Sequence, residues 1–321
     1  MEENKLKLIN MADVQVEEVA WLLYPLIPFG KITILQGDPG EGKTTVMLHI
    51  IACLTKGESL SFVDEKSEYE PMNVIYQTAE DGLGDTIKPR LLDAGADCSK
   101  VLVIDDSDEA LTITDDRLEM AIEVTGAKLV VLDPLQGYLG AGVDMHRANE
   151  IRPLMHRLSV LAEKYGCAVV LIGHMNKNSM GKASYRGLGS IDISAAARSV
   201  IVCGRIKDDP EMRVLCQIKN SLAPEAQAIA FRLDKETGFA WQGEVDVTVD
   251  ELISGEFRVS KLKEAEAFLR EVLAEGELGA KEVYVLAEQD GIKRKTLLNA
   301  KDKLGILVTK KQNKWYWKMN D

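Results

Sequence analysis

One short stretch of the chain combines glycines, a lysine and hydroxyl side chains in a spacing that holds phosphate. Residues 37–44 read GDPGEGKT and fit the pattern G-x-x-x-x-G-K-[ST]. In such a loop the glycines let backbone N–H groups wrap closely around phosphate oxygens, the lysine reaches the β and γ oxygens, and the final hydroxyl ligates Mg²⁺. The sequence therefore predicts a site for ATP and Mg²⁺. The residues expected to contact the nucleotide are Gly37, Asp38, Pro39, Gly40, Glu41, Gly42, Lys43, Thr44 and Thr45.

A second group that binds the Mg²⁺ ion is expected at the end of another buried strand. The run KLVVLD places Asp133 directly after consecutive apolar residues, where a Mg²⁺-phosphate site usually draws its acid. The run VLVIDD offers Asp105 as a rival, and an Asp before proline is also common in plain strand-ending turns. Asp133 is the preferred candidate, so Thr44 and Asp133 form the predicted metal-binding pair.

Two further polar residues follow apolar runs and could act on the attacking water or on the γ-phosphate. Glu80 lies just past NVIYQ and could orient or deprotonate water, although a solvated loop acid or a helix cap would look the same, and Asp81 would suit that role equally. His174 follows CAVVLIG, where it could touch the γ-phosphate and report its loss, or could be an ordinary core histidine. Lys43, Glu80, Asp133 and His174 are the predicted catalytic residues.

These residues need a framework that brings the ends of several strands together. From KITILQ onward, short apolar runs alternate with amphipathic segments, which is typical of a mostly parallel sheet covered by helices on both faces. The predicted fold class is therefore α/β, with ligands at the carboxyl edge of the strands. The expected strands are KITILQ, NVIYQ, VLVID, KLVVLD, CAVVLIG and RSVIVCG, followed by hairpin-like strands in EMRVLCQIKN and AIAFRLDKETGFAWQ; the expected helices cover residues 44–54, a segment from about 83, 116–124 and 150–164.

The order of these motifs resembles that of a known family. The chain contains, in this order, IPFGKITILQGDPGEGKTT, VIYQTAED, LVVLDPLQGYL, VVLIGHMNK and SYRGLGSIDISAAARSV. Over residues 14–242 it resembles the RecA-like ATPases of the RepA and DnaB hexameric helicase group, particularly the RepA-like proteins of plasmids, phages and integrated elements. The resemblance implies a RecA-like fold, with Glu80 as catalytic carboxylate, Asp133 as Walker B acid and His174 as the polar residue of the third helicase motif.

The resemblance also implies a homo-oligomer, a hexameric ring with ATP at the subunit interfaces and single-stranded DNA in the channel. Two loops, at about residues 137–149 and 176–190, would face that channel. The second loop carries Lys177, Lys182 and Arg186 as candidate DNA contacts. A mobile loop with ordinary surface bases is the alternative.

Ring helicases of this kind insert a basic finger, often an arginine, into the ATP site of a neighbouring subunit, near a K-x-R-N-G-like stretch. The comparable residues here, 217–221, read QIKNS. Lysine stands at the arginine position and glutamine at the upstream lysine position. Lys219 is therefore the first candidate for the finger and Arg205 the second.

The pattern of the chain changes near its end. An acidic, weakly periodic stretch gives way to short helical segments and a terminal hairpin, which together predict a winged-helix-like domain. In its candidate recognition helix, Lys293, Arg294 and Lys295 could meet the phosphates of duplex DNA, or the domain could contact only protein. The expected division of the chain is an N-terminal segment (1–25), an ATPase domain (26–242), a linker (243–260) and the winged-helix-like domain (261–321).

Composition limits the partners that the chain can have. The net charge of −12 over 321 residues argues against a surface that binds nucleic acid everywhere, so DNA contacts are expected to be local. From residue 261 onward, thirteen Lys or Arg stand against ten Asp or Glu, which marks the tail as a separate, slightly basic unit. The five scattered cysteines, the absence of a signal-peptide pattern and the lack of a long apolar run predict a cytoplasmic protein with free thiols and no membrane segment.

Two functions fit these features. The first is an ATP-driven DNA translocase or helicase in the replication of a plasmid, phage or mobile element. The alternative is an ATP-controlled DNA-binding protein for regulation, recombination or loading, which unwinds no strand.

Overall fold

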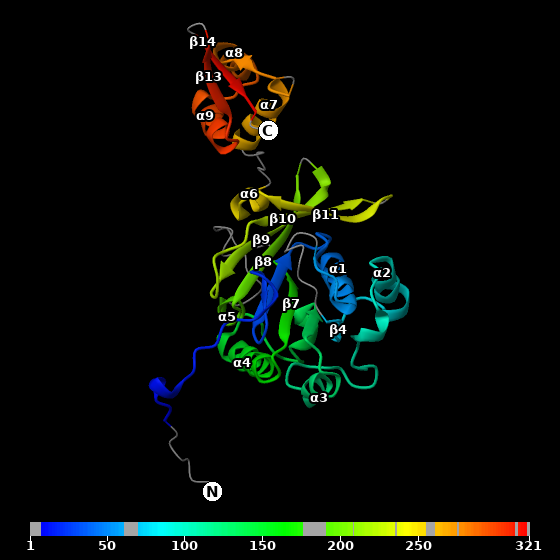
Figure 1. Cartoon of the computed structure of the whole chain (residues 1–321). Coiled ribbons are helices and arrows are strands. Elements are labelled where there is room, and N and C mark those ends of the chain that lie inside the picture. The colour runs from blue at the N-terminus through cyan, green and yellow to red at the C-terminus, as the bar shows by residue number, and fades with distance from the viewer. Residues whose placement is uncertain are drawn as a thin grey trace.

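The computed structural model describes residues 8–60, 70–175, 191–207, 209–234, 236–254, 261–274, 276–311 and 314–319. These residues form two units, each with its own hydrophobic core (Figure 1). The first unit is built on a large sheet and contains the predicted phosphate loop. The second is a small unit at the C-terminal end.

In the described part of the chain, the large sheet has nine strands in the order β11-β10-β9-β8-β3-β7-β6-β4-β5. The strands from β8 to β5 run parallel to one another, and β9, β10 and β11 are added antiparallel at one side. The strands are β3 (Ile32–Gly37), β4 (Val74–Thr78), β5 (Val101–Leu102), β6 (Leu129–Asp133), β7 (Ala168–His174), β8 (Ser199–Ile206), β9 (Asp209–Asn220), β10 (Ala228–Asp234) and β11 (Gly238–Val245). The predicted strands are therefore present, although β5 is shorter than VLVID.

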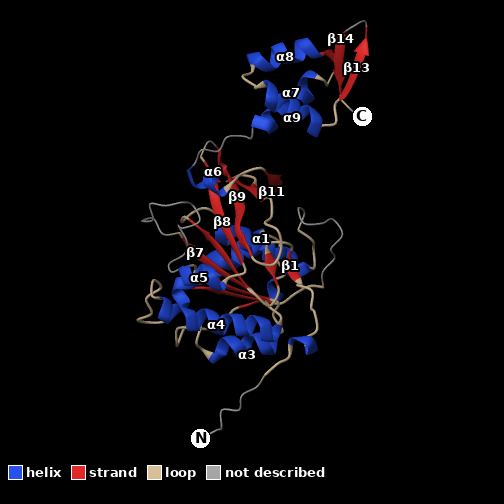
Figure 2. Ribbon diagram, turned by 90° about the vertical axis from the view of Figure 1, so that its left-hand side faces the viewer, coloured by secondary structure: helices blue, strands red, loops and turns tan. Residues whose placement is uncertain are grey.

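Helices cover both faces of this sheet (Figure 2). Side chains of β6 alternate between the faces, since Leu129 and Val131 pack with α1 and α2, whereas Val130 and Leu132 pack with α3, α4 and α5. The helices of this unit are α1 (Lys43–Lys56), α2 (Lys88–Asp93), α3 (Asp116–Thr125), α4 (Ala148–Tyr165), α5 (Ile191–Ala196) and α6 (Val249–Ser254), with a π-helical turn at Leu83–Ile87 before α2. The doubly covered sheet confirms the predicted α/β class.

The register of the parallel strands brings the predicted site residues to one edge. Gly37 at the end of β3 pairs with His174 at the end of β7. Thr78 at the end of β4 pairs with Asp133 at the end of β6. Because parallel strands all finish on the same side, the loops that follow them meet there.

The N-terminal part of the chain joins the first unit. A short 3₁₀ turn, Met11–Asp13, precedes the two-stranded sheet of β1 (Trp21–Leu23) and β2 (Ile27–Pro28). Leu22 and Leu23 are buried in the core that also holds α1. The packed structure therefore starts before residue 26, where the ATPase domain is predicted to begin.

The other predicted domain boundary also differs from the structure. Residues 243–254, predicted as part of a linker, complete β11 and form α6, which packs against β8 and β9. The fit is close, because a Cβ atom at Gly204 of β8 would lie 2.9 Å from Leu252 of α6. The stretch is acidic overall, so its composition did not indicate that Val247 and Leu252 pack against β8 and β9. Residues 255–260 lie outside the described residues.

Among the described residues, the C-terminal unit contains three helices and a three-stranded sheet in the order β12-β14-β13. Its core includes Leu269, Val283, Leu297 and Trp317, which come from the three helices and from the last strand. The elements are α7 (Lys261–Val272), β12 (Leu278–Gly279), α8 (Ala280–Gln289), α9 (Arg294–Lys303), β13 (Leu307–Lys311) and β14 (Lys314–Lys318). The predicted helices and terminal hairpin are thus present.

The five cysteines are free. None of the helices in the described ranges combines the length and apolar content that crossing a bilayer requires.

Candidate nucleotide-binding site

The predicted phosphate loop joins β3 to α1 at the carboxyl edge of the sheet. Gly37 ends β3, and a Cβ atom there would collide with the backbone carbonyl of Cys203 on β8, so this close approach requires glycine. Gly42 precedes α1 with a φ of 89°, which favours glycine. A Cβ at Gly42 would also lie 2.6 Å from Leu233 Cδ1. Backbone geometry thus accounts for both glycines, and the loop leads directly into a helix N-terminus suited to anions.

Lys43 begins α1 and directs its ammonium group into the loop. Its Nζ donates hydrogen bonds to the carbonyl oxygens of Gly37 at 3.0 Å and Asp38 at 2.8 Å. The residue is only 5% exposed, and burial lowers its pKa. The loop therefore encloses a cation where phosphate oxygens would be bound.

Thr44 and Asp133 meet across the sheet edge. Thr44 Oγ1 donates a hydrogen bond to Asp133 Oδ2 at 2.6 Å. Burial raises the pKa of Asp133, and the hydrogen bonds from Thr44 and Tyr76 oppose this rise. Because the Thr44 proton is used in the bond to Asp133, the lone pairs of Oγ1 remain available to a cation.

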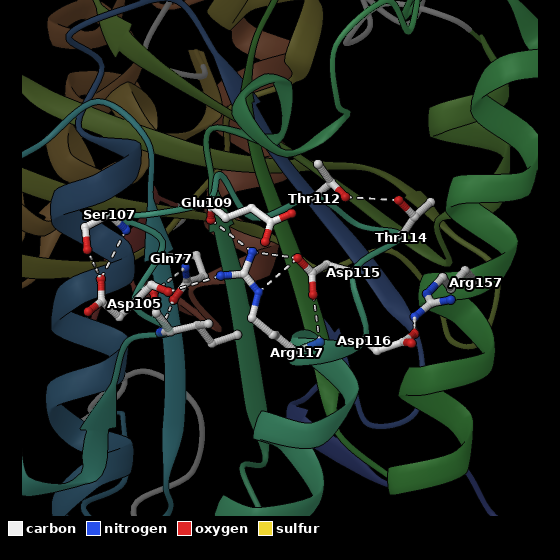
Figure 3. Close-up of polar contacts among 11 residues, drawn as sticks. Gln77, Asp105, Ser107, Glu109, Thr112, Thr114, Asp115, Asp116, Arg117 and Arg157 are labelled. Carbon is white, nitrogen blue, oxygen red and sulfur yellow. Dashed lines mark hydrogen bonds and ion pairs between the residues drawn. The ribbon is translucent and has the colours of Figure 1, made fainter.

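The rival acid, Asp105, lies in a turn of its own (Figure 3). Its Oδ1 accepts hydrogen bonds from the Ser107 N–H at 3.1 Å and from Ser107 Oγ at 2.7 Å, and these bonds lower its pKa. Asp133 is thus the acid that meets Thr44, whereas Asp105 forms a turn.

Side chains hold the segment around Asp105 in place after β5 ends (Figure 3). Arg117 donates to the backbone oxygens of Asp105 at 3.2 Å and Glu109 at 2.9 Å. Gln77, fully buried on β4, accepts from the Ile104 N–H at 2.6 Å and donates to the Ile104 carbonyl at 3.3 Å. The Gln77 amide therefore replaces a strand partner where pairing between β4 and β5 has stopped.

His174 lies between Lys43 and Glu80. Its Nδ1 is 3.5 Å from Lys43 Nζ, and its Nε2 is 4.0 Å from Glu80 Oε1. An ammonium group can only donate, so Nδ1 accepts and a neutral His174 carries its proton on Nε2, facing Glu80. Asp81, the alternative to Glu80, pairs instead with Arg90 at 3.2 Å. The structure thus brings the four predicted catalytic residues to one edge of the sheet.

Both candidates for the trans finger bind groups of their own chain. Arg205 Nη2 donates to the Gly40 carbonyl at 3.2 Å, and its Nε lies 3.7 Å from Glu41 Oε2. Lys219 Nζ donates to the carbonyls of Ser194, Ala195 and Ala197 at 2.9, 3.1 and 2.7 Å. These carbonyls form the C-terminal end of α5, where a positive charge is favourable.

We therefore expect Lys219→Ala to lower the free energy of unfolding by about 1.5–3 kcal/mol, the range for hydrogen bonds to a charged group. Denaturant unfolding of the variant measures this. The exposed Lys207 provides the control, since Lys207→Ala should change stability by no more than about 0.5 kcal/mol. Unchanged stability together with lost ATP turnover would instead favour the finger role for Lys219.

The candidate DNA contacts are described only in part. At the start of α9, Lys293 and Arg294 are exposed, and the Arg294 guanidinium lies 4.6 Å from the centre of the Tyr284 ring. The side chain of Lys295 lies outside the described residues. So do three predicted contacts in the loop at 176–190: Lys177, Lys182 and Arg186.

Tyr76 is a residue of this site that the sequence did not reveal. Its hydroxyl donates a hydrogen bond to Asp133 Oδ2 at 2.8 Å. In the run NVIYQ a tyrosine is indistinguishable from any aromatic of a buried strand. The one available signal was a hydroxyl in an otherwise apolar segment, because a buried Tyr O–H usually has a partner.

The side chains at this edge fit a Mg²⁺ ion. Thr44 and Asp133 offer a hydroxyl oxygen and a carboxylate, and Mg²⁺ prefers oxygen ligands from one or two carboxylates together with substrate phosphates and water. Among the described residues, no group of three or more His, Cys, Asp or Glu side chains forms a closed metal cage. The donors therefore suit a cation that arrives with a nucleotide.

This fold and site define the class of the protein, a P-loop ATPase with a RecA-like core. The matching family is described as "AAA domain", and its match covers residues 2–180. The chain belongs to this family.

Two proteins named RecA are also similar to the chain. Protein RecA of Clostridium novyi (strain NT) is 25% identical over 243 residues, which cover 70% of this chain and 64% of the relative. Protein RecA of Rickettsia canadensis (strain McKiel) is 23% identical over 234 residues, covering 68% and 64%. The chain thus spans less than two thirds of the length of these curated relatives.

Proposed function

We propose that this protein hydrolyses ATP to drive movement along DNA, as a translocase or helicase of the RepA-like type that replicates a plasmid, phage or mobile element. One observation carries the proposal. The Thr44–Asp133 pair and the row formed by Lys43, His174 and Glu80 lie at the same sheet edge. This arrangement combines phosphate binding, metal binding and a candidate base.

Each residue has a role in this proposal. Lys43 and the loop N–H groups bind the β- and γ-phosphates, while Thr44 and Asp133 would hold the Mg²⁺ ion, which neutralises charge on the phosphate oxygens when bound. Glu80 orients the attacking water and accepts its proton. His174, placed between Glu80 and Lys43, links the γ-phosphate position to the segment that follows β7.

The order of the motifs and the distribution of charge support DNA as the partner and a ring as the assembly. The order of motifs over residues 14–242 resembles that of hexameric helicases, and the C-terminal unit is slightly basic within an acidic chain. Single-stranded DNA would lie in the channel of a homo-hexamer. Duplex DNA would contact the C-terminal unit as it contacts a winged helix. Its phosphates would meet the basic residues in and beside α9, which are Lys293, Arg294 and Lys295.

The test is ATP turnover by the full chain with and without single-stranded DNA, together with its mass in solution in the presence of ATP. We expect turnover to rise severalfold with DNA and the mass to correspond to a ring. ATP turnover that is the same with and without DNA at low salt would contradict a motor that moves along DNA. The absence of any turnover would contradict the ATPase itself.

The alternative is a DNA-binding regulator or loading factor in which ATP controls assembly and no strand is unwound. It is favoured by the contacts of Arg205 and Lys219, since both candidate fingers bind carbonyls of their own chain. A forked duplex separates the two functions. The motor opens it in the presence of ATP, whereas the regulator binds it and leaves it closed.

A further inference from the structure

The carboxylate of Asp133 is held by two hydroxyl groups that come from different elements. Thr44 Oγ1 on α1 donates at 2.6 Å and the Tyr76 hydroxyl on β4 at 2.8 Å. Both bonds fall on Oδ2, and neither uses Oδ1. Two donors from different elements restrict rotation of the carboxylate about its Cβ–Cγ bond more than a single donor would.

Tyr76 is well placed to provide a rigid anchor. It is fully buried, and its ring packs in the core that joins α1 to the sheet, with Val74, Val131 and Ile172 among its members. A tyrosine ring has only two side-chain torsions, and close packing restricts both. The hydroxyl is therefore held in place by the core of the protein rather than by the phosphate loop.

We propose that Tyr76 is a positioning residue for the metal site, which holds Asp133 so that Oδ1 and the Thr44 lone pairs face the cation. This inference rests on the proposed ATPase function and adds a residue to it. Tyr76 does not touch the nucleotide or the ion and acts only through Asp133. Such second-layer partners of metal ligands typically change metal affinity about 10–100-fold when removed.

The test is the binding of a fluorescent ADP analogue to the full-length protein over a range of free Mg²⁺ concentrations. In Tyr76→Phe we expect the Mg²⁺ concentration for half-maximal enhancement of binding to rise about 10–100-fold. Binding in EDTA should stay unchanged, because Lys43 and the loop N–H groups are untouched. An identical Mg²⁺ dependence in Tyr76→Phe and the parent would overturn the proposal.

Tyr138 provides a matched control. It is also a buried tyrosine, 1% exposed, and its hydroxyl has no hydrogen-bond partner among the described residues. Tyr138→Phe removes the same atom from a buried tyrosine for which no hydrogen bond to Asp133 is found, and it should leave the Mg²⁺ dependence unchanged. An equal shift in both variants would attribute the effect to general packing and would overturn the positioning role.

A double-mutant cycle separates positioning from plain destabilisation. If Tyr76 acts only through Asp133, then adding Tyr76→Phe to Asp133→Asn should change nucleotide binding no further. A further loss of the same size in that background would contradict the proposal, even if both variants unfold at lower temperature. A parent protein that binds no nucleotide would overturn the proposed function and this inference together, whereas normal Mg²⁺ dependence in Tyr76→Phe overturns the inference alone.

Discussion

Replacing Lys43 by alanine is expected to reduce ATP turnover by at least about 10²–10³-fold, the loss typical of removing one preorganised donor to a developing charge. The loop would keep its backbone N–H groups but lose the cation that it encloses. Among the described residues, Lys43 Nζ makes its hydrogen bonds to carbonyl oxygens and to His174, and phosphate oxygens can replace these acceptors when a nucleotide binds. Steady-state ATPase measurement provides the test.

A second lysine of the same helix is the control for this change. Lys56, in the last turn of α1, lies 3.8 Å from Glu58 at the protein surface. Lys56→Ala should keep parental turnover, and both variants should unfold cooperatively. If Lys43→Ala hydrolysed ATP at the parental rate, residues 37–44 would not be the nucleotide loop.

Changing Glu80 to glutamine is expected to separate binding from chemistry. Glutamine preserves the shape of the side chain but cannot accept a proton, so turnover should fall by about 10²-fold or more, the contribution of a general base. ATP affinity should remain, because Lys43 and Thr44 are unchanged, and ATP-bound assemblies should accumulate. Single-turnover hydrolysis and nucleotide binding on the same samples measure both effects.

Asp81 allows a strict control at the neighbouring position. Its carboxylate pairs with Arg90 at 3.2 Å, while Glu80 faces His174. We therefore expect Asp81→Asn to retain most of the turnover. If the two variants behaved in the opposite way, Asp81 would be the base and Glu80 a surface acid.

The phosphate loop and the succession of strands along the chain could be predicted because their signals are local, whereas the order of the strands within the sheet was not predicted. The glycines, Lys43 and Thr44 all lie within residues 37–44, and each parallel strand is a run of mainly apolar residues. The choice between Asp133 and Asp105 was harder, since both follow apolar runs. It depends on the register of β4 and β6 and on the Ser107 turn, which spacing alone does not encode.

The remaining features depend on partners that are distant in sequence. Lys219 meets the carbonyls at the end of α5, more than twenty positions earlier, and Arg205 meets the loop at Gly40. Tyr76 finds Asp133 on a neighbouring strand. In each case the residue type was visible in the sequence, but its partner was determined by the packing of the sheet and the helices.

The packing of α6 on β8 also determines where the chain can be cut. A fragment that stops at Gln242 follows the composition of the sequence, yet it would lack Val247 and Leu252 and leave Val202, Val214 and Gly204 uncovered. Such a fragment would expose an apolar surface to solvent and would tend to aggregate during expression. A fragment that ends after Ser254 keeps this apolar surface covered by α6. The boundary of a recombinant ATPase fragment is therefore best placed between α6 and α7.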